Sequence, residues 1–161
     1  VSLLTQKTIS RTISLNGIGI HTGSKVNLKI KPASPNTGII FKRVDLSTKN
    51  IVYPNYLNVS DTTLCTTITN EYGVKVSTIE HLMGAFYGVG IDNAIVELDS
   101  QEVPIMDGSA KIFVERIKQA GLKFSHQPIK IIKINKNIVV EDENKFISIS
   151  KSNISGDIEL K

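Results

Sequence analysis

The sequence contains no tryptophan, one cysteine and three histidines among its 161 residues. Its single cysteine, Cys65, cannot form a disulfide within the chain, which is typical of proteins that work in a reducing compartment. No apolar run reaches the roughly 18 residues of a transmembrane helix. The apolar run near the N-terminus is too short for a signal peptide. These absences favour a cytoplasmic protein.

Clustered positive charge is also missing, although the formal net charge is +4. The basic residues are mostly lysines and are scattered along the chain. Nucleic-acid-binding proteins concentrate basic residues on one surface, so the sequence argues against such a partner. A mildly basic surface suits an anionic small molecule, or is simply solvated. An apolar content of 40% is enough for a packed core and argues against disorder.

The periodicity of apolar residues predicts both strands and helices. A tight loop follows the first strand, because "NGIGIHTG" holds three glycines in eight residues. Helices are expected over 77–89 and about 109–120, the second with Ser109 as N-cap and Gly121 as its stop. Strands are expected over the following segments: 7–15, 25–33, 39–45, a hairpin around Asn70–Gly73, and 93–100.

Because the helices lie between hairpins rather than in a repeated βαβ order, the expected fold class is α+β. We expect residues 1–124 to form a two-layer domain, with a mostly antiparallel sheet and helices on one face. Residues 125–128, "SHQP", are expected to be a linker. Residues 129–161 alternate strand and turn without a helix and cannot bury both faces of a sheet. They predict the truncated start of a second, similar domain.

The stretch "STIEHLMGAFYGVG" raises the functional question. Ser77 and Glu80 have the spacing of a helix capping box, so Glu80 could be structural. A lone histidine such as His81 is usually structural, with the polar atoms of its ring satisfied by hydrogen bonds. The alternative is that Glu80 is a general base and His81 a metal ligand, since a neutral imidazole binds metals and a neighbouring carboxylate can accept a proton.

Helical spacing predicts two covered faces on this helix. Its apolar stripe contains the residues at i, i+3, i+4, i+7 and i+8, namely Ile79, Leu82, Met83, Phe86 and Tyr87. The face with His81 continues through Gly84, Ala85 and Gly88. Glycine is costly inside a helix, and small residues allow a second backbone to approach closely. We therefore expect another element to pack there.

Four segments in order closely resemble one family, the UDP-3-O-acyl-N-acetylglucosamine deacetylases, zinc enzymes of lipid A and lipopolysaccharide synthesis in Gram-negative bacteria. These segments are "GIGIHTGSKVNLKIKPASPNTGIIFKRVD", "DTTLCTT", "VSTIEHLMGAFYGVGIDNAIVEL" and "EVPIMDGSA". The resemblance covers roughly residues 6–161. It implies two α+β domains whose helices are sandwiched between two sheets, so a second-domain helix would cover the small-residue face.

The resemblance also implies site residues. Glu80 matches the catalytic general base and His81 the first Zn²⁺ ligand. Leu64 and Cys65 match a segment at the substrate edge of the site, although Cys65 on its own would be read as a small buried hydrophobe. His21 and Asp107 match loops near the substrate, or are a loop histidine and a helix-start carboxylate.

The family's other two zinc ligands lie in a His-Lys-x-x-Asp motif that this sequence does not contain. His126 is followed by Gln127 and does not match that motif. The implied reaction is zinc-dependent hydrolysis of the N-acetyl group of UDP-3-O-acyl-N-acetylglucosamine, with the 161-residue chain inactive alone. A non-catalytic binding module on the same scaffold is the alternative, and the gene sequence after Lys161 would separate the two.

The uncovered helix face or strands 129–161 predict a dimer.

Overall fold

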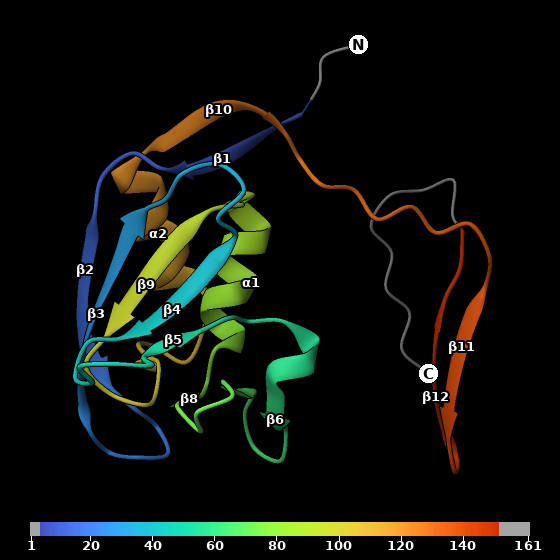
Figure 1. The fold of residues 1–161 in the computed structure, drawn as a ribbon, viewed down its shortest axis with the longest axis horizontal. Coiled ribbons are helices and arrows are strands. Elements are labelled where there is room, and N and C mark those ends of the chain that lie inside the picture. The colour runs from blue at the N-terminus through green and yellow to red at the C-terminus, as the bar shows by residue number, and fades with distance from the viewer. Residues whose placement is uncertain (1–3, 152–161) are drawn as a thin grey trace. The chain divides into compact units, whose positions relative to one another are not determined.

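The computed structural model describes residues 4–151. The chain divides into two compact units between Ile129 and Lys130, and each is described by itself. The first unit is built on a five-stranded sheet in the order β2-β3-β9-β4-β5 (Figure 1). Only the β4–β9 pair within this sheet is parallel. Its strands, in chain order, are β2 (Ile13–Ile18), β3 (Lys25–Pro32), β4 (Ile39–Arg43), β5 (Ile51–Val52) and β9 (Ala94–Leu98).

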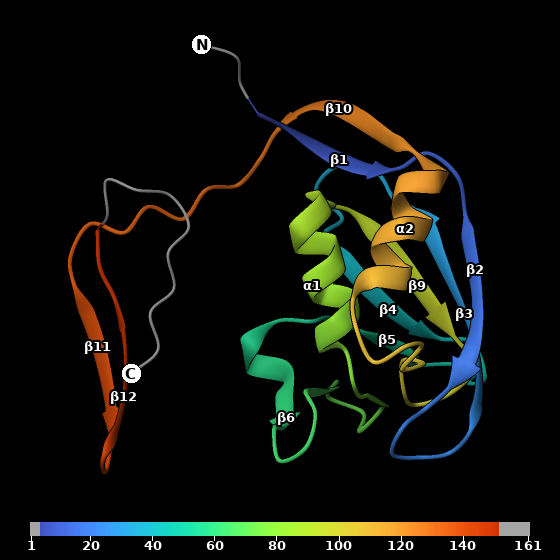
Figure 2. The same cartoon turned by 180° about the vertical axis from the view of Figure 1, so that it is seen from behind.

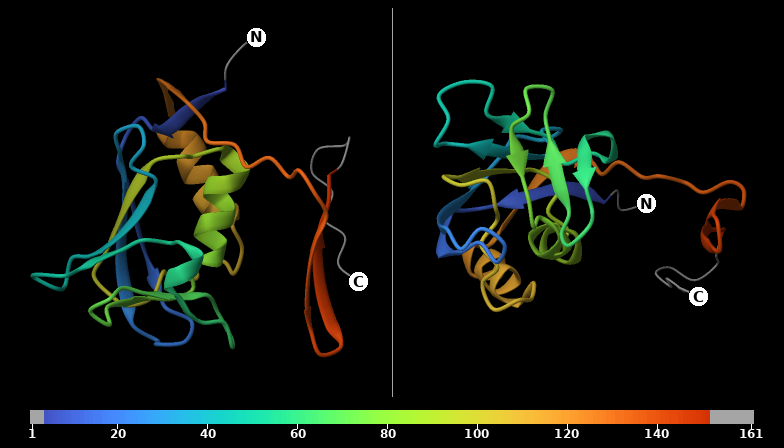
Figure 3. Two further views of the ribbon diagram at one scale, coloured as in Figure 1. Left: turned by 45° about the vertical axis from the view of Figure 1, so that its right-hand side comes forward. Right: turned by 90° about the horizontal axis from the view of Figure 1, so that it is seen from below.

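Two helices, α1 (Glu80–Val89) and α2 (Lys111–Ala120), cover one face of this sheet (Figures 2 and 3). The alternation in β3 explains the arrangement, because Val26, Leu28 and Ile30 are buried under the helices while the intervening side chains face outward. The α+β class and the helices on one face are confirmed. Gly121 ends α2 as predicted, with a φ of 79° that favours glycine.

The α2 start differs from the prediction, because Ala110 occupies the N-cap position and makes no side-chain cap. Ser109 lies one residue earlier, and its Oγ accepts the N–H of Lys111 at 3.1 Å. Between the helices and the sheet, three phenylalanines (Phe41, Phe86 and Phe113) are at most 1% exposed. Burial of such a side chain contributes about 1.5–3 kcal/mol, so this layer fixes both helices on the sheet.

A separate two-stranded ribbon joins the beginning and end of the unit. It pairs β1 (Thr5–Ile9) antiparallel with β10 (Leu122–Pro128). Residues 7–15 were expected to be one strand, but the chain bends after Ile9, where Ser10 N–H donates to Gly121 O at 2.8 Å. Residues 125–128, expected to be a linker, form the end of β10. Alternation alone did not reveal either difference, because both depend on a partner far away in the sequence.

Buried amides fasten this ribbon to the turn before β4. Gln6 and Asn93 are 4% and 2% exposed. Gln6 Oε1 accepts from Asn93 Nδ2 at 3.0 Å and from Asn36 N at 2.8 Å, while Asn93 Oδ1 accepts from Gly38 N at 2.9 Å. Gln6 Nε2 also donates to Asn36 Oδ1 and Pro128 O, so every polar side-chain atom of Gln6 and Asn93 has a protein partner.

A small three-stranded sheet contains β6 (Val59–Asp61), β7 (Thr67–Thr69) and β8 (Lys75–Val76). A short 3₁₀ helix, η1 (Tyr56–Asn58), precedes it. The predicted hairpin is confirmed, since β7 and β8 pair antiparallel and Asn70 N–H donates to Val74 O. This sheet leads directly into α1 and so carries the chain to the start of that helix.

The described part of the second unit is a single hairpin, β11 (Ile138–Asp142) paired with β12 (Lys145–Ile149). The strand expected immediately after residue 129 does not form, and residues 152–161 lie outside the described part of the chain. Across residues 4–151, no helix has both the length and the apolar content needed to cross a bilayer.

We predict that Asn93→Ala destabilises the first unit by about 1–3 kcal/mol, because it leaves Gly38 N–H without its acceptor and removes one of the two donors to Gln6 Oε1. Chemical denaturation measures this loss. Asn16→Ala is the matched control, since Asn16 is exposed on β2, and it should change stability by less than about 0.5 kcal/mol. Equal effects from both variants would contradict a structural role for the amide network.

Candidate active site

The α1 helix begins without the predicted capping box. Its N-cap residue is Ile79, which makes no side-chain cap. Ser77 Oγ donates instead to Gln101 O at 3.1 Å. The capping assignment for Glu80 is therefore wrong, because the chain turns at Thr78 and directs Ser77 away from the helix.

The carboxylate of Glu80 is held by the loop before β7. Thr66 N–H donates to Glu80 Oε2 at 3.0 Å, and Ile79 N–H donates to Thr66 O at 3.5 Å. Within residues 4–151, Oε1 of Glu80 accepts no hydrogen bond, and the residue is exposed. A carboxylate at a helix N-terminus is also stabilised by the helix dipole. Glu80 thus combines one anchored oxygen with one open oxygen.

His81 follows Glu80 in the first turn and is half-buried. Successive residues of an α-helix point about 100° apart around the axis, so the two side chains diverge from the same end of α1. The structure brings Leu64 and Cys65 to this end as well, because they precede the Thr66 contact. Leu64 is 80% exposed and Cys65 is half-buried, with its Sγ 3.7 Å from Thr67 Oγ1.

A buried carboxylate connects the glycine loop to the same helix start. Glu102 is 0% exposed, and it accepts four hydrogen bonds. Its donors are the backbone N–H groups of His21 (3.0 Å) and Thr22 (2.9 Å) and the hydroxyls of Thr22 (2.7 Å) and Thr78 (2.9 Å). The imidazole of His21 is exposed, so the structure fixes its backbone near the site rather than its ring.

Burial by itself would raise the pKa of Glu102, since it disfavours the charged form. The hydrogen bonds from His21, Thr22 and Thr78 outweigh that effect, so the pKa lies below its usual value. Gly19 is required beside this carboxylate, because a Cβ there would collide with Glu102 Oε2 and Thr22 Oγ1. No motif in the sequence points to Glu102, because a glutamate is rarely buried and is ordinarily expected at the surface.

Thr78 has a backbone conformation that is uncommon for its type. Its φ is +56°, although it is β-branched, and it is 3% exposed. Such a conformation costs about 1–3 kcal/mol and persists only where surrounding contacts impose it. Those contacts are the bond from Thr78 Oγ1 to Glu102 and the hydrogen bonds between Ser77 and residues 101 and 103.

Asp107 is the predicted site residue that the described contacts do not bring to Glu80. Its Oδ1 accepts from Ser109 Oγ at 3.0 Å and from Ser109 N at 3.1 Å, and these bonds lower its pKa. The preceding residues pack against the end of β2, where Ile105 N–H donates to Ile18 O. Asp107 therefore organises the turn before α2.

The open face of α1 differs from the one expected. Ala85 is 1% exposed and packs inside its own unit, whereas Tyr87, expected in the apolar stripe, is 91% exposed. Ile79, Leu82 and Phe86 are buried as predicted. The exposed residues fall at i, i+4, i+7 and i+8, and we call them the open α1 face: Glu80, Gly84, Tyr87 and Gly88.

Metal ligands are incomplete in the described part of the chain. No group of three His, Cys, Asp or Glu side chains there could hold a metal ion. A catalytic zinc site takes about three protein ligands, and this end of α1 offers one imidazole beside one carboxylate. The donor types fit zinc, and the set needs ligands from other residues.

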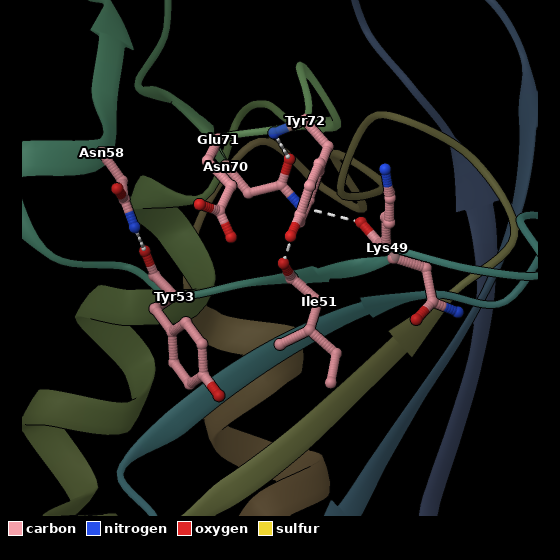
Figure 4. A pocket seen from close by; sticks show the side chains of 8 residues that line it. Lys49, Ile51, Tyr53, Asn58, Asn70, Glu71 and Tyr72 are labelled. Carbon is pink, nitrogen blue, oxygen red and sulfur yellow. Dashed lines mark hydrogen bonds between the residues drawn. The ribbon is translucent and has the colours of Figure 1, made fainter.

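A hollow of about 440 Å³ lies apart from Glu80 and His81, between β5 and the β7–β8 turn (Figure 4). Asn70 on its wall is fully engaged, because its amide donates to Lys49 O and Ile51 O while its Oδ1 accepts from Tyr72 N and Val74 N. The Lys49 ammonium lies 4.3 Å from the centroid of the Tyr72 ring. These polar groups interact with one another, so we assign the hollow a structural role and not a ligand-binding one.

Comparison with known proteins identifies the scaffold. The family model of LpxC, described as UDP-3-O-acyl N-acetylglycosamine deacetylase, matches residues 6–161. The chain belongs to this family. The deacetylase of Chromohalobacter salexigens is 50% identical over 143 residues, which cover 89% of this chain and 47% of that protein.

Two further UDP-3-O-acyl-N-acetylglucosamine deacetylases give the same picture. That of Idiomarina loihiensis is 46% identical over 91% of this chain and 48% of its own length. That of Vibrio cholerae is 43% identical over 89% of this chain and 47% of its own length. The chain therefore spans about half the length of the deacetylases that it matches.

We predict that Glu102 makes stability depend on pH. Because its pKa is lowered in the folded state, its contribution is fully present above the unfolded value of about 4.3 and is lost as pH falls through the folded value. Glu102→Gln should cost about 1–3 kcal/mol at pH 7, and the difference from wild type should shrink below about pH 4.

Denaturation of both proteins between pH 3 and 7 measures this convergence. Glu115→Gln on the exposed side of α2 is the matched control and should behave as wild type at every pH. Parallel curves for wild type and Glu102→Gln would contradict the charge-dependent role of Glu102.

Proposed function

We propose that this chain provides the general base and one metal ligand for hydrolysis of the N-acetyl group of UDP-3-O-acyl-N-acetylglucosamine. This reaction is the committed step of lipid A synthesis, and we place it in the cytoplasm. The single observation that carries the proposal is the pairing of Glu80 and His81 at one end of α1, with Glu80 anchored on Thr66 N–H. Family membership and the names of the relatives support the substrate and the reaction class.

Glu80 is the proposed general base. Thr66 N–H fixes Oε2, and the open Oε1 is the atom that accepts the proton of the attacking water. The same carboxylate can return this proton to the leaving amine, or a group elsewhere in the enzyme can do so. An anchored but exposed carboxylate suits a general base, because the Thr66 hydrogen bond fixes its position while its second oxygen is available to accept a proton.

His81 is the proposed first ligand of Zn²⁺. When bound, zinc supplies Lewis-acid polarisation of the acetamide carbonyl and stabilises the negative charge that develops on its oxygen. His81 is held for this purpose by the first turn of α1, on a side of the helix that is half-buried. We propose that the remaining ligands come from outside residues 4–151, and that the 161-residue chain alone has no activity.

Substrate contacts are proposed for the segments around this pair. Leu64 and Cys65 border Glu80 through the Thr66 hydrogen bond, which supports a role for them in contacting the sugar nucleotide near the reacting group. His21 projects from the loop that Glu102 holds, and Asp107 from the turn before α2. We propose that His21 and Asp107 line the periphery of the substrate site.

We predict that Glu80→Gln in the full-length enzyme lowers kcat by about 10²–10⁴-fold and leaves bound zinc unchanged, because the amide keeps an acceptor for Thr66 but cannot take a proton. Steady-state kinetics and metal analysis measure these effects. His81→Ala should instead reduce the zinc content.

Glu115→Gln, on the exposed side of α2, is the control for removal of a carboxylate and should leave kcat unchanged. A kcat within a few-fold of wild type for Glu80→Gln would show that Glu80 is not the base. It would favour a non-catalytic role for this scaffold.

Two surfaces of the described residues are open to a partner. On the open α1 face, a methyl group added to Gly84 or Gly88 would meet nothing within 4 Å. These glycines are therefore not required by packing within the first unit, although each costs about 1 kcal/mol relative to alanine in a helix. The β11–β12 hairpin exposes Val140 by 60% and Ile147 by 63%. An isolated hairpin is only marginally stable in water.

We propose that a second-domain helix covers the open α1 face in the full-length enzyme, and we predict that the 161-residue chain alone forms a dimer at micromolar concentration through this face or the hairpin. Multi-angle light scattering over a concentration series measures the mass. Tyr87→Lys and Ile147→Lys should weaken association, one for each surface. A concentration-independent monomer of 17.7 kDa would contradict the prediction.

A further inference from the structure

The start of α1 is held by a turn rather than by a side-chain cap. Its N-cap residue, Ile79, has ordinary helical dihedral angles. The residue before it, Thr78, has a φ of +56°. The direction in which the helix leaves the small sheet is therefore set at Thr78, two residues before Glu80.

Hydrogen bonds on both sides of Thr78 tie this turn to the segment around Glu102. Ser77 N–H donates to Gln101 O at 2.9 Å, and Val103 N–H donates to Ser77 O at 3.0 Å. Between them, the Thr78 hydroxyl donates to Glu102 Oε1 at 2.9 Å. Rotation of Thr78 to a common φ would break the hydroxyl bond and redirect the first turn of α1. It would also draw Glu80 away from Thr66 N–H.

The same carboxylate holds the loop that carries His21. Both oxygens of Glu102 are used, since Oε1 accepts from His21 N and Thr78 Oγ1 while Oε2 accepts from the backbone and hydroxyl of Thr22. The loop cannot slide relative to α1 without breaking bonds to a charge that has no access to water. Glu102 thus fixes the spacing between two parts of the proposed site.

We propose that Thr78 and Glu102 act as a positioning pair for the catalytic carboxylate of Glu80. Neither residue reaches the reacting atoms in this arrangement. They act through the backbone, by imposing the left-handed turn from which Glu80 and His81 project. This inference rests on the proposed function, because it assigns to the pair an effect on the step that Glu80 performs.

The test compares three replacements of Thr78 in the full-length enzyme. Thr78→Ser keeps the hydroxyl, Thr78→Val keeps the branched shape without it, and Thr78→Gly removes the hydroxyl while tolerating positive φ. We expect Thr78→Val and Thr78→Gly to lower kcat by about 10–100-fold with KM within a few-fold, since small displacements of a catalytic group have effects of this size. Thr78→Ser should stay within a few-fold of wild type.

Thr8→Val is the matched control, because it removes a hydroxyl on β1 that accepts Ala33 N–H. The neighbouring Lys7 O accepts Asp92 N–H just after α1, so the control lies near the end of α1 that is far from Glu80. It should lower the unfolding midpoint without changing kcat. If Thr78→Val folds poorly, Thr78→Gly still decides the question. Equal kcat values for Thr78→Ser and the folded hydroxyl-free variants would overturn the proposal. The proposed function would stand in that case, provided that Glu80→Gln still lowers kcat by at least about 10²-fold.

Discussion

A carboxylate without access to water must find donors within the protein, and Glu102 finds four. Removing a charge from water costs several kcal/mol unless hydrogen bonds replace the lost solvation. That requirement draws together the glycine loop and the turn before α1, which are distant in the sequence. Gly19 leaves space for the Glu102 carboxylate, and Thr78 adopts a strained φ while its hydroxyl donates to that carboxylate. The candidate site is therefore assembled around a carboxylate that is itself fully buried.

The rest of the first unit buries one side of α1 and leaves its other side exposed. The five-stranded sheet and the phenylalanine layer hold α1 along its buried side, through Leu82 and Phe86. The opposite side carries Glu80, two glycines and Tyr87, and it makes little contact with its own unit. A helix fixed on one side and open on the other can present a catalytic group without losing its position.

Sequence reasoning predicted the elements with clear periodicity, such as β3, the β7–β8 hairpin and the C-terminal end of α2. It failed where the outcome depends on a distant partner. Residues 125–128 read as a linker because their pairing with β1 leaves no local pattern. The spacing of Ser77 and Glu80 matched a capping box, so a capping role for Glu80 was considered. The positive φ of Thr78, which turns Ser77 away from the helix, could not be predicted because threonine rarely adopts it. Glu80 and His81 were predicted as site residues from the family motif, whereas the four donors to Glu102 could be identified only from the structure.

The β1–β10 ribbon has a consequence for how the protein is made. Gln6 on β1 bonds to Pro128 O across 122 positions of sequence, so the first strand waits for nearly the whole unit before it gains its partner. Contacts between residues so far apart in the sequence form late and slowly, because the entropy cost of closing a long loop must be met before the contact can stabilise the fold. During synthesis on the ribosome, the sheet and helices can assemble vectorially while the N-terminal strand remains unpaired. Closure of this ribbon then completes the unit, because β10 is the last of its elements to be synthesised.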